Sequence, residues 1–136
     1  MDNPLIVSAA RGYAHLVKTL LNNGADINLQ NKDGKTALFC AVYKNKEASV
    51  DVLLQKKADP NISPNDMKTP LMEASSDGNT SLVKKLLLYG ANANSKDKQG
   101  KTAYDWARNN AIERILVFTC GSAIMAKCKK VQPSLS

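Results

Sequence analysis

The chain is poor in the side chains from which most enzyme sites are built. It has one histidine, His15, and three cysteines with no CxxC spacing, and only 5% of its 136 residues are aromatic. No cysteine or carboxylate stands at metal-ligand spacing from His15, and there is no phosphate-binding loop or nucleophile elbow. Turn formation explains the repeated aspartates Asp26, Asp33 and Asp59. Without a paired acid and base, the sequence predicts a protein that is not an enzyme and has no cofactor or metal.

The sequence also lacks segments that direct a chain into or across a membrane. No apolar run approaches the roughly 18 residues of a membrane-spanning helix, and residues 1–4 do not begin a basic-then-apolar leader. Three cysteines, an odd number, do not form a disulfide framework, and Cys40 is expected to pack as a small apolar side chain. We therefore expect an intracellular protein, cytoplasmic or nuclear, without membrane association and monomeric by itself.

Negative charge is scarce, and so is arginine. The formal net charge is +7, and only 3 of the 19 basic residues are arginines. Guanidinium groups favour bidentate phosphate recognition, and single-strand binders rely on aromatic stacking. The lysine-rich, aromatic-poor composition therefore favours acidic protein surfaces over nucleic acid as partners.

Most of the chain consists of internal sequence repeats. Three Lys-Thr pairs, which begin at Lys35, Lys68 and Lys101, are spaced by 33 residues. A fixed period of this length indicates stacked supersecondary units that bury their apolar faces only against their neighbours. The same period links the turn segments at residues 24–28, 57–61 and 90–94, and the Val-x-x-Leu-Leu segments at residues 17–21, 50–54 and 83–87.

These units resemble the ankyrin repeat, a turn followed by two antiparallel helices. The resemblance rests on Thr69-Pro70-Leu71, on Gly90-Ala91 and on the paired leucines. It implies an all-α solenoid of helix-turn-helix units joined by short β-hairpins or turns. The expected ankyrin repeat domain covers residues 1–120, and a short helical extension and disordered tail follow at 121–136. The expected repeats lie at about 3–34, 35–67, 68–100 and 101–120.

Several residues bear on where helices begin and end and on how stable each repeat is. Thr36 and Thr69 are expected to cap the first helices of repeats two and three, and Asn45 to end the former in a left-handed conformation. Lys57 stands where a glycine belongs and is expected to cost about 1 kcal/mol. We therefore expect repeat two to be the least stable unit and repeat three the most stable.

One departure from the family concerns a polar contact between repeats. The resemblance implies a Thr-Pro-Leu-His segment whose histidine hydrogen-bonds within and between repeats. The histidine position here holds Ile6, Phe39, Met72 and Asp105. Packing is expected to replace that polar ladder in the first three repeats.

The resemblance implies that partners bind the concave surface formed by the turn tips and the exposed face of each first helix. Lys35, Lys68 and Lys101 share one position there, and we expect an exposed row of charge that meets a partner or, alternatively, only solvent. Charge reversal at all three is expected to abolish binding without unfolding, because lysine near a helix N-terminus is slightly unfavourable.

Aromatic side chains on this surface are the expected anchors of a partner. Tyr43 is expected to be exposed, whereas Phe39 either contributes to binding or fills the space left by the missing histidine. Trp106 is expected to be half exposed, and to pack under the C-terminal extension or act as a second anchor. The expected partner-binding residues are Lys32, Lys35, Phe39, Tyr43, Lys44, Lys68, Asp77, Lys98, Lys101 and Trp106.

Three asparagines recur in the turns, each eight residues after a leucine. Asn28, Asn61 and Asn94 resemble the setting in which ankyrin asparagines are hydroxylated by an oxygen-dependent hydroxylase. The alternative is that these asparagines only shape the turn.

The sequence thus predicts a non-catalytic protein–protein interaction module, a scaffold or adaptor, that binds a partner with acidic groups on its concave face. Nucleic-acid or nucleotide binding through the same lysines is one alternative, and a targeting fragment of a larger multidomain protein is another. The dependence of binding on salt separates the first two, because nucleic-acid binding weakens steeply and log-linearly with salt.

Overall fold

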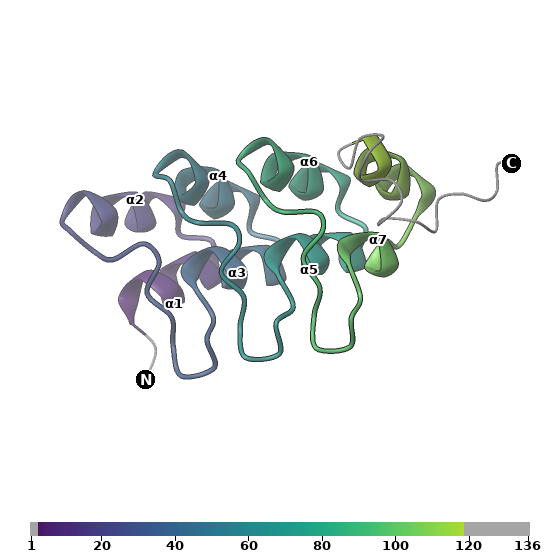
Figure 1. The fold of residues 1–136 in the computed structure, drawn as a ribbon. Helices are drawn as coiled ribbons and strands as arrows, with labels where there is room; N and C mark the ends of the chain where they lie inside the picture. Colours follow the sequence, from purple (N-terminus) through teal and green to yellow (C-terminus); the bar gives the residue numbers. More distant parts are fainter. Residues whose placement is uncertain (1–2, 119–136) are drawn as a thin grey trace, which may run out of the picture.

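The described part of the chain is a stack of helical repeats (Figure 1). The structure, a computed structural model, describes residues 3–118, so the extension expected at 121–136 lies outside the described residues. The predicted all-α solenoid of helix-turn-helix units is confirmed. No strand occurs within residues 3–118, and the connections are hairpin-shaped loops. The helices are α1 (Pro4–Arg11), α2 (Ala14–Asn22), α3 (Ala37–Tyr43), α4 (Glu47–Gln55), α5 (Pro70–Asp77), α6 (Thr80–Leu88), α7 (Ala103–Trp106) and a last helix over residues 110–118.

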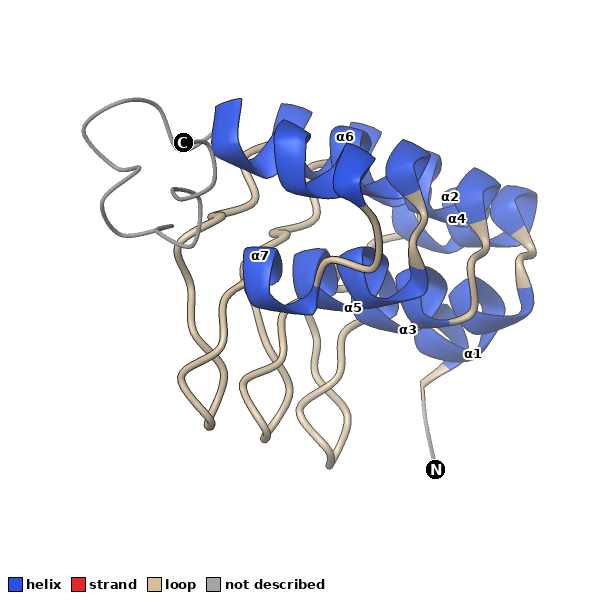
Figure 2. Ribbon diagram, turned by 90° about the vertical axis from the view of Figure 1, so that its right-hand side faces the viewer, coloured by secondary structure: helices blue, strands red, loops and turns tan. Residues whose placement is uncertain are grey.

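The helices form two layers, with a row of loops beside them (Figure 2). In the inner layer α1 packs on α3, α3 on α5 and α5 on α7, while α2, α4 and α6 lie in the outer layer. The loops between outer and inner helices project past the inner layer, so loops and inner helices border one face, here called the inner face. None of the helices in residues 3–118 has the length and apolar character needed to span a membrane.

The inner helices of repeats two and three begin at the threonines expected to cap them. Thr36 accepts a hydrogen bond from the backbone N–H of Phe39 at 3.1 Å, and Thr69 accepts one from Met72 at 3.2 Å. Each bond satisfies a backbone donor that the first turn of a helix leaves without a partner. The capping residues therefore fix where the inner helices start, and with them the register of the inner face.

Buried apolar side chains occupy the position at which the resemblance to the ankyrin repeat implies a histidine. Ile6, Phe39 and Met72 are each at most 3% exposed, which confirms that apolar contacts replace the polar ladder in three repeats. Asp105 caps its own helix instead, where its carboxylate accepts a hydrogen bond from the backbone N–H of Thr102 at 3.0 Å.

Left-handed backbone outside glycine is concentrated in repeat two. In the described residues it occurs at Asn45, Lys57 and Met67, with φ of 59°, 71° and 64°. The first two were expected, whereas Met67 was not recognised from the sequence. A side chain makes this conformation cost roughly 1–2 kcal/mol. The residues one period later are Gly78, Gly90 and Gly100.

Candidate functional site

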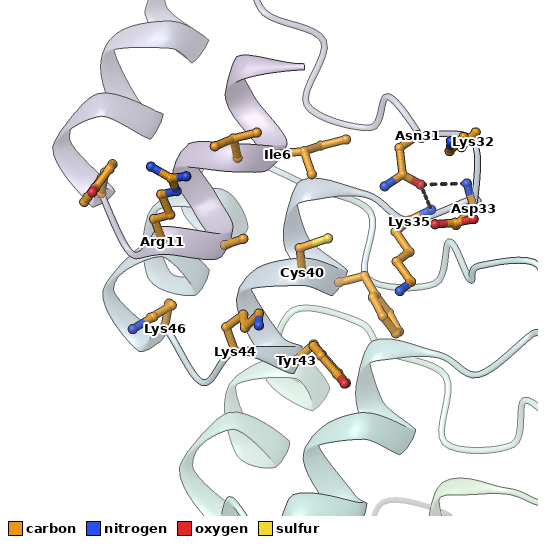
Figure 3. Close-up of a pocket in the computed structure, with 14 residues that line it drawn as sticks. Ile6, Arg11, Asn31, Lys32, Asp33, Lys35, Cys40, Tyr43, Lys44 and Lys46 are labelled. Carbon is orange, nitrogen blue, oxygen red and sulfur yellow. Dashed lines mark hydrogen bonds between the residues drawn. The ribbon is translucent and has the colours of Figure 1, made fainter. Parts of the chain in front are cut away.

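A groove lies on the inner face between the first and second repeats (Figure 3). Its walls come from α1, from the loop at residues 31–35 and from α3, and its volume is about 1020 Å³. Two repeats contribute to it because α1 packs directly on α3. We call it the N-terminal groove.

The rim of the N-terminal groove is strongly basic. Five cations line it against a single carboxylate, and none of the five forms an ion pair within residues 3–118. A cluster of like charges without counter-ions attracts a ligand of opposite charge. The cations are Arg11, Lys32, Lys35, Lys44 and Lys46, and the carboxylate is Asp33.

Tyr43 stands exposed at this rim, as predicted. It is 53% exposed, and its ring stacks on that of Phe39 with 6.4 Å between centroids. The ammonium groups of Lys35 and Lys44 lie 5.8 and 5.7 Å from the centroid of the Tyr43 ring. Phe39 itself is 3% exposed and so fills the space of the missing histidine. Of the two aromatic residues, Tyr43 has the surface that a ligand can contact.

Small side chains form the floor of the groove. Val7 and Ala10 come from α1 and Cys40 from α3, and all three are half-buried. Cys40 packs against the core, as expected for a small apolar side chain, and its sulfur is in view in Figure 3. The floor is thus apolar and set below a cationic rim.

Arg11, Tyr13 and Lys46 are among the residues that line this groove but are absent from the expected binding set. The 33-residue period offered a signal for Arg11, which aligns with the predicted residue Lys44. The position of Lys46 depends on a contact between repeats, because the aliphatic part of its side chain packs over Gly12 of the first repeat. A Cβ added to Gly12, which has φ of 82°, would lie 3.0 Å from Cδ of Lys46. Glycine at position 12 therefore lets Lys46 reach the groove.

The lysines at the repeating position do not form the uniformly exposed row that was expected. Lys101 is exposed, but Lys35 and Lys68 are half-buried. Lys68 lies 3.3 Å from the carboxylate of Glu73 and 3.8 Å from the ring centroid of Trp106. The ring of Trp106 also lies 4.9 Å from the ammonium of Lys101. Rings and a carboxylate on the inner helices draw these ammonium groups inwards, which corrects the expectation of an equivalent, solvated row.

Trp106 is half-buried, as expected, and an aspartate in the third loop holds it. Its indole N–H donates to Asp97 at 2.9 Å, and the same carboxylate accepts the backbone N–H groups of Gln99 and Lys101. Burial alone would raise the pKa of Asp97, but these bonds hold that pKa below its ordinary value. The expected packing of Trp106 under the C-terminal extension involves residues that lie outside the described part of the chain.

Two further expected binding residues lie away from the N-terminal groove. Asp77 is exposed and accepts a hydrogen bond from the side-chain amide of Asn45 at 3.1 Å. Lys98 is exposed on the third loop, where its backbone N–H donates to the carbonyl of Asp66 at 3.4 Å. The structure thus brings Lys32, Lys35, Tyr43 and Lys44 together and leaves Asp77 and Lys98 elsewhere.

Two of the three recurring asparagines, Asn28 and Asn61, tie neighbouring loops together. The side-chain oxygen of Asn28 accepts the backbone N–H of Asp59 at 2.9 Å, and that of Asn61 accepts the backbone N–H of Asn92 at 2.7 Å. The backbone N–H of Asn94 donates to the side chain of Asn92 at 2.9 Å. These contacts favour the turn-shaping interpretation, and hydroxylation of the three asparagines stays a prediction.

The outer layer has an ion network of its own. The ammonium of Lys85 lies 2.8 Å from Asp51 and 3.2 Å from Glu47, and the bond to Asp51 raises the pKa of Lys85 above its usual range. Burial alone would raise the pKa of Glu47, but hydrogen bonds from Lys85, Ser81 and Asn79 hold it below its ordinary value. This network joins α4 to α6 and takes no part in the groove.

The chemistry available at the N-terminal groove is that of binding. Its lining offers cations, an exposed aromatic ring and small apolar side chains. His15 is exposed on α2. In the part of the chain that the structure describes, no three His, Cys, Asp or Glu side chains gather to hold a metal ion.

Comparison with protein families identifies the repeat. A family model described as "Ankyrin repeats (3 copies)" matches residues 1–64, and one described as "Ankyrin repeats (many copies)" matches residues 53–107. The two matches overlap and together run from residue 1 to residue 107.

Similar stretches occur in much longer proteins. Potassium channel AKT2/3 of Arabidopsis thaliana is 34% identical over 100 residues, 74% of this chain and 12% of the channel. A transient receptor potential cation channel subfamily A member 1 homolog of Caenorhabditis elegans is 38% identical over 111 residues, 81% of this chain and 9% of that protein. Ankyrin repeat and SOCS box protein 16 of Mus musculus is 36% identical over 112 residues, 76% of this chain and 25% of that protein. The chain thus spans about a tenth of the two channels and a quarter of the third relative.

Proposed function

The chain belongs to the ankyrin repeat family, whose repeats are generally protein–protein interaction modules, and we propose that it binds an acidic segment of another protein. The segment lies in the N-terminal groove, and the chain itself performs no catalysis. In a longer protein, the same groove would serve as a scaffold or adaptor site. We place this binding inside the cell, in the cytoplasm or nucleus.

One observation carries the proposal: five cations and one carboxylate surround the groove, and none of those cations has an ion-pair partner within residues 3–118. In the other half of the inner face, Lys68 is already paired with Glu73 and lies against Trp106. An acidic segment would therefore have to displace Glu73 to pair with Lys68, whereas no carboxylate among the described residues is paired with Lys35. Complementary charge of this kind mainly sets association rate and specificity.

The affinity then comes from apolar contacts that lose water when the partner binds. Tyr43 offers an exposed aromatic ring at the rim. Tyrosine is one of the residue types enriched among the residues that anchor protein interfaces. The packing of Tyr43 on Phe39 fixes the orientation of the ring before a partner arrives. A pre-oriented ring loses little conformational entropy on binding.

The experiment is a charge reversal read out with a fluorescein-labelled acidic peptide. Lys35→Glu/Lys44→Glu is expected to weaken binding by about tenfold or more, because each removes a close charge pair. Lys18→Glu/Lys84→Glu is the matched control: the net charge changes equally, but both side chains are exposed on outer helices. Equal weakening by the two double variants would mean that only net charge matters, and would overturn the proposal.

A single-stranded DNA oligonucleotide of equal charge tests the nucleic-acid alternative in the same assay. Its binding is expected to be weaker than that of the peptide at physiological salt. The peptide affinity is expected to fall modestly between low and physiological salt, since part of it comes from apolar contact. Tighter binding of the DNA, with a steep log-linear salt dependence, would favour the alternative function.

A further inference from the structure

The chain contains an internal example of how an aromatic ring sits on its inner face. The 33-residue period aligns Trp106 with Val7, Cys40 and Glu73. In the fourth repeat the ring of Trp106 lies 4.9 Å from the ammonium of Lys101, which belongs to the same repeat. It also lies 3.8 Å from the ammonium of Lys68, one repeat earlier. This register of the inner face thus accepts an indole beneath a lysine.

The second repeat has the same lysine but no ring at the register of Trp106, although the Lys35 ammonium lies 5.9 and 5.8 Å from the ring centroids of Phe39 and Tyr43. Lys35 is the counterpart of Lys101, and Cys40 is the counterpart of Trp106. Cys40 and its counterpart in repeat one, Val7, are both small and half-buried, and both line the N-terminal groove. The groove therefore lies where the fourth repeat places its indole.

In the third repeat, the position aligned with Trp106 holds a carboxylate in place of a ring. Glu73 stands at the aligned position and pairs with Lys68 at 3.3 Å. Ring and carboxylate are thus the two groups with which this chain itself satisfies the repeating lysine. The N-terminal groove leaves Lys35 without a carboxylate partner among the described residues, and with Val7, Ala10 and Cys40 as its apolar floor.

We propose that the groove recognises a partner segment in which an aromatic side chain has carboxylates on both sides. The aromatic ring lies on the floor over Cys40 and beneath Lys35, as Trp106 lies beneath Lys101. The flanking carboxylates meet Arg11, Lys44 and Lys46 at one end and Lys32 at the other. This inference rests on the proposed function and adds the identity of the central residue of the ligand.

The test compares three fluorescein-labelled peptides of equal charge on the wild-type protein. Each has three glutamates on either side of one central residue, which is Trp, Leu or Ser. The Trp peptide is expected to bind about tenfold more tightly than the Ser peptide and several-fold more tightly than the Leu peptide, because a ring adds a cation–π contact to apolar burial. Equal affinity of the Trp and Leu peptides would overturn the aromatic assignment.

A variant that fills the groove from within gives an independent test. Cys40→Trp places an indole at the register of Trp106, and it is expected to reduce the affinity of the Trp peptide to that of the Ser peptide. Gln55→Trp adds the same side chain at an exposed position at the end of α4 and is expected to keep the preference. Retention of the preference in a folded Cys40→Trp variant, checked by circular dichroism, would contradict the inference.

The same assay separates this inference from the proposed function. If Lys35→Glu/Lys44→Glu weakens all three peptides while the wild type does not distinguish among them, acidic docking holds and the aromatic site fails. If that variant leaves all three affinities unchanged, the proposed function itself fails. Should Cys40→Trp not fold, the comparison of the three peptides on the wild type still decides the inference.

Discussion

At the scale of single residues, identical lysines at one repeat position have different surroundings. Lys35 lies against Phe39, 5.9 Å from the ring centroid, and has no ion-pair partner in the described residues. Lys68 is only 18% exposed in its side chain and is paired with Glu73. The periodicity identified the position, but only the neighbouring side chains distinguish a lysine available for binding from one used in the fold.

We therefore predict that charge reversal separates the two lysines. Lys68→Glu places a carboxylate beside Glu73 and removes an ammonium from the ring of Trp106, so it is expected to cost about 1–3 kcal/mol of stability. Lys35→Glu is expected to cost less, about 0.5–1 kcal/mol, because Lys35 has no ion-pair partner in the described residues and loses only its contacts with the rings of Phe39 and Tyr43. Urea denaturation of the two single variants measures this. If Lys68→Glu were as stable as the wild type, Lys68 would contribute nothing to the stability of the fold. The expectation that all three lysines can be reversed without unfolding the protein would then hold.

A second prediction concerns the left-handed backbone of repeat two. Lys57→Gly and Met67→Gly are each expected to stabilise the protein by roughly 0.5–1 kcal/mol, since glycine removes the left-handed penalty but loses more entropy on folding. Lys56→Gly is the control, because Lys56 has φ of −89° and no strain to relieve. The midpoint of urea unfolding should rise for the first two variants and fall for the control. A fall for all three would show that the turns carry no strain.

At the scale of the elements, the sequence predicted what depends on local rules. The capping threonines, the left-handed Asn45 and the apolar stripes all act within one repeat, and the helices form where those signals place them. The left-handed Met67 was missed although the sequence carries a signal for it, because the 33-residue period aligns Met67 with Gly34 and Gly100, both of which have positive φ. The groove escaped notice because it requires residues from two repeats, such as Gly12 and Lys46, to meet. Sequence patterns within one repeat do not show which side chains of neighbouring repeats come into contact.

Repeat two is predicted to be the least protected unit against hydrogen exchange. Among residues 3–118 it contains all three left-handed residues other than glycine, and also Ser49, a fully buried residue whose hydroxyl has no hydrogen-bond partner there. A buried polar group left unsatisfied costs about 1–3 kcal/mol. Backbone amides of residues 43–56 should exchange faster than those of residues 71–88. Slower exchange in the former segment would contradict this ranking.

The fourth repeat is predicted to lose stability in acid through Asp97. Its pKa is lowered in the folded state, so its carboxylate adds stability that is complete above about pH 5 and is lost as pH falls below about 4. Melting curves of wild type and Asp97→Asn should therefore differ most near neutral pH and converge as the pH approaches 3. A difference that stays constant over this range would show that hydrogen bonding by the carboxylate does not depend on its charge.

At the scale of the whole molecule, the inner face has two unlike halves. Towards the C-terminal end of the described residues, Lys68, Glu73 and Trp106 satisfy one another. Between the first two repeats, cations surround a small apolar floor. On the proposed function, such a stack binds at one end only, because the side chains between the repeated positions differ from repeat to repeat.

The most direct measurement is a chemical-shift titration of the nitrogen-15-labelled protein with the acidic peptide that carries a central Trp. The largest shifts are expected in the loop at residues 31–35 and in residues 40–46, the two segments of repeat two and its loop that contribute side chains to the N-terminal groove. Residues 96–101 of the third loop, which contains three lysines, provide the internal comparison and are expected to shift little. Largest shifts at residues 96–101, or equal shifts at both loops, would contradict binding at the N-terminal groove.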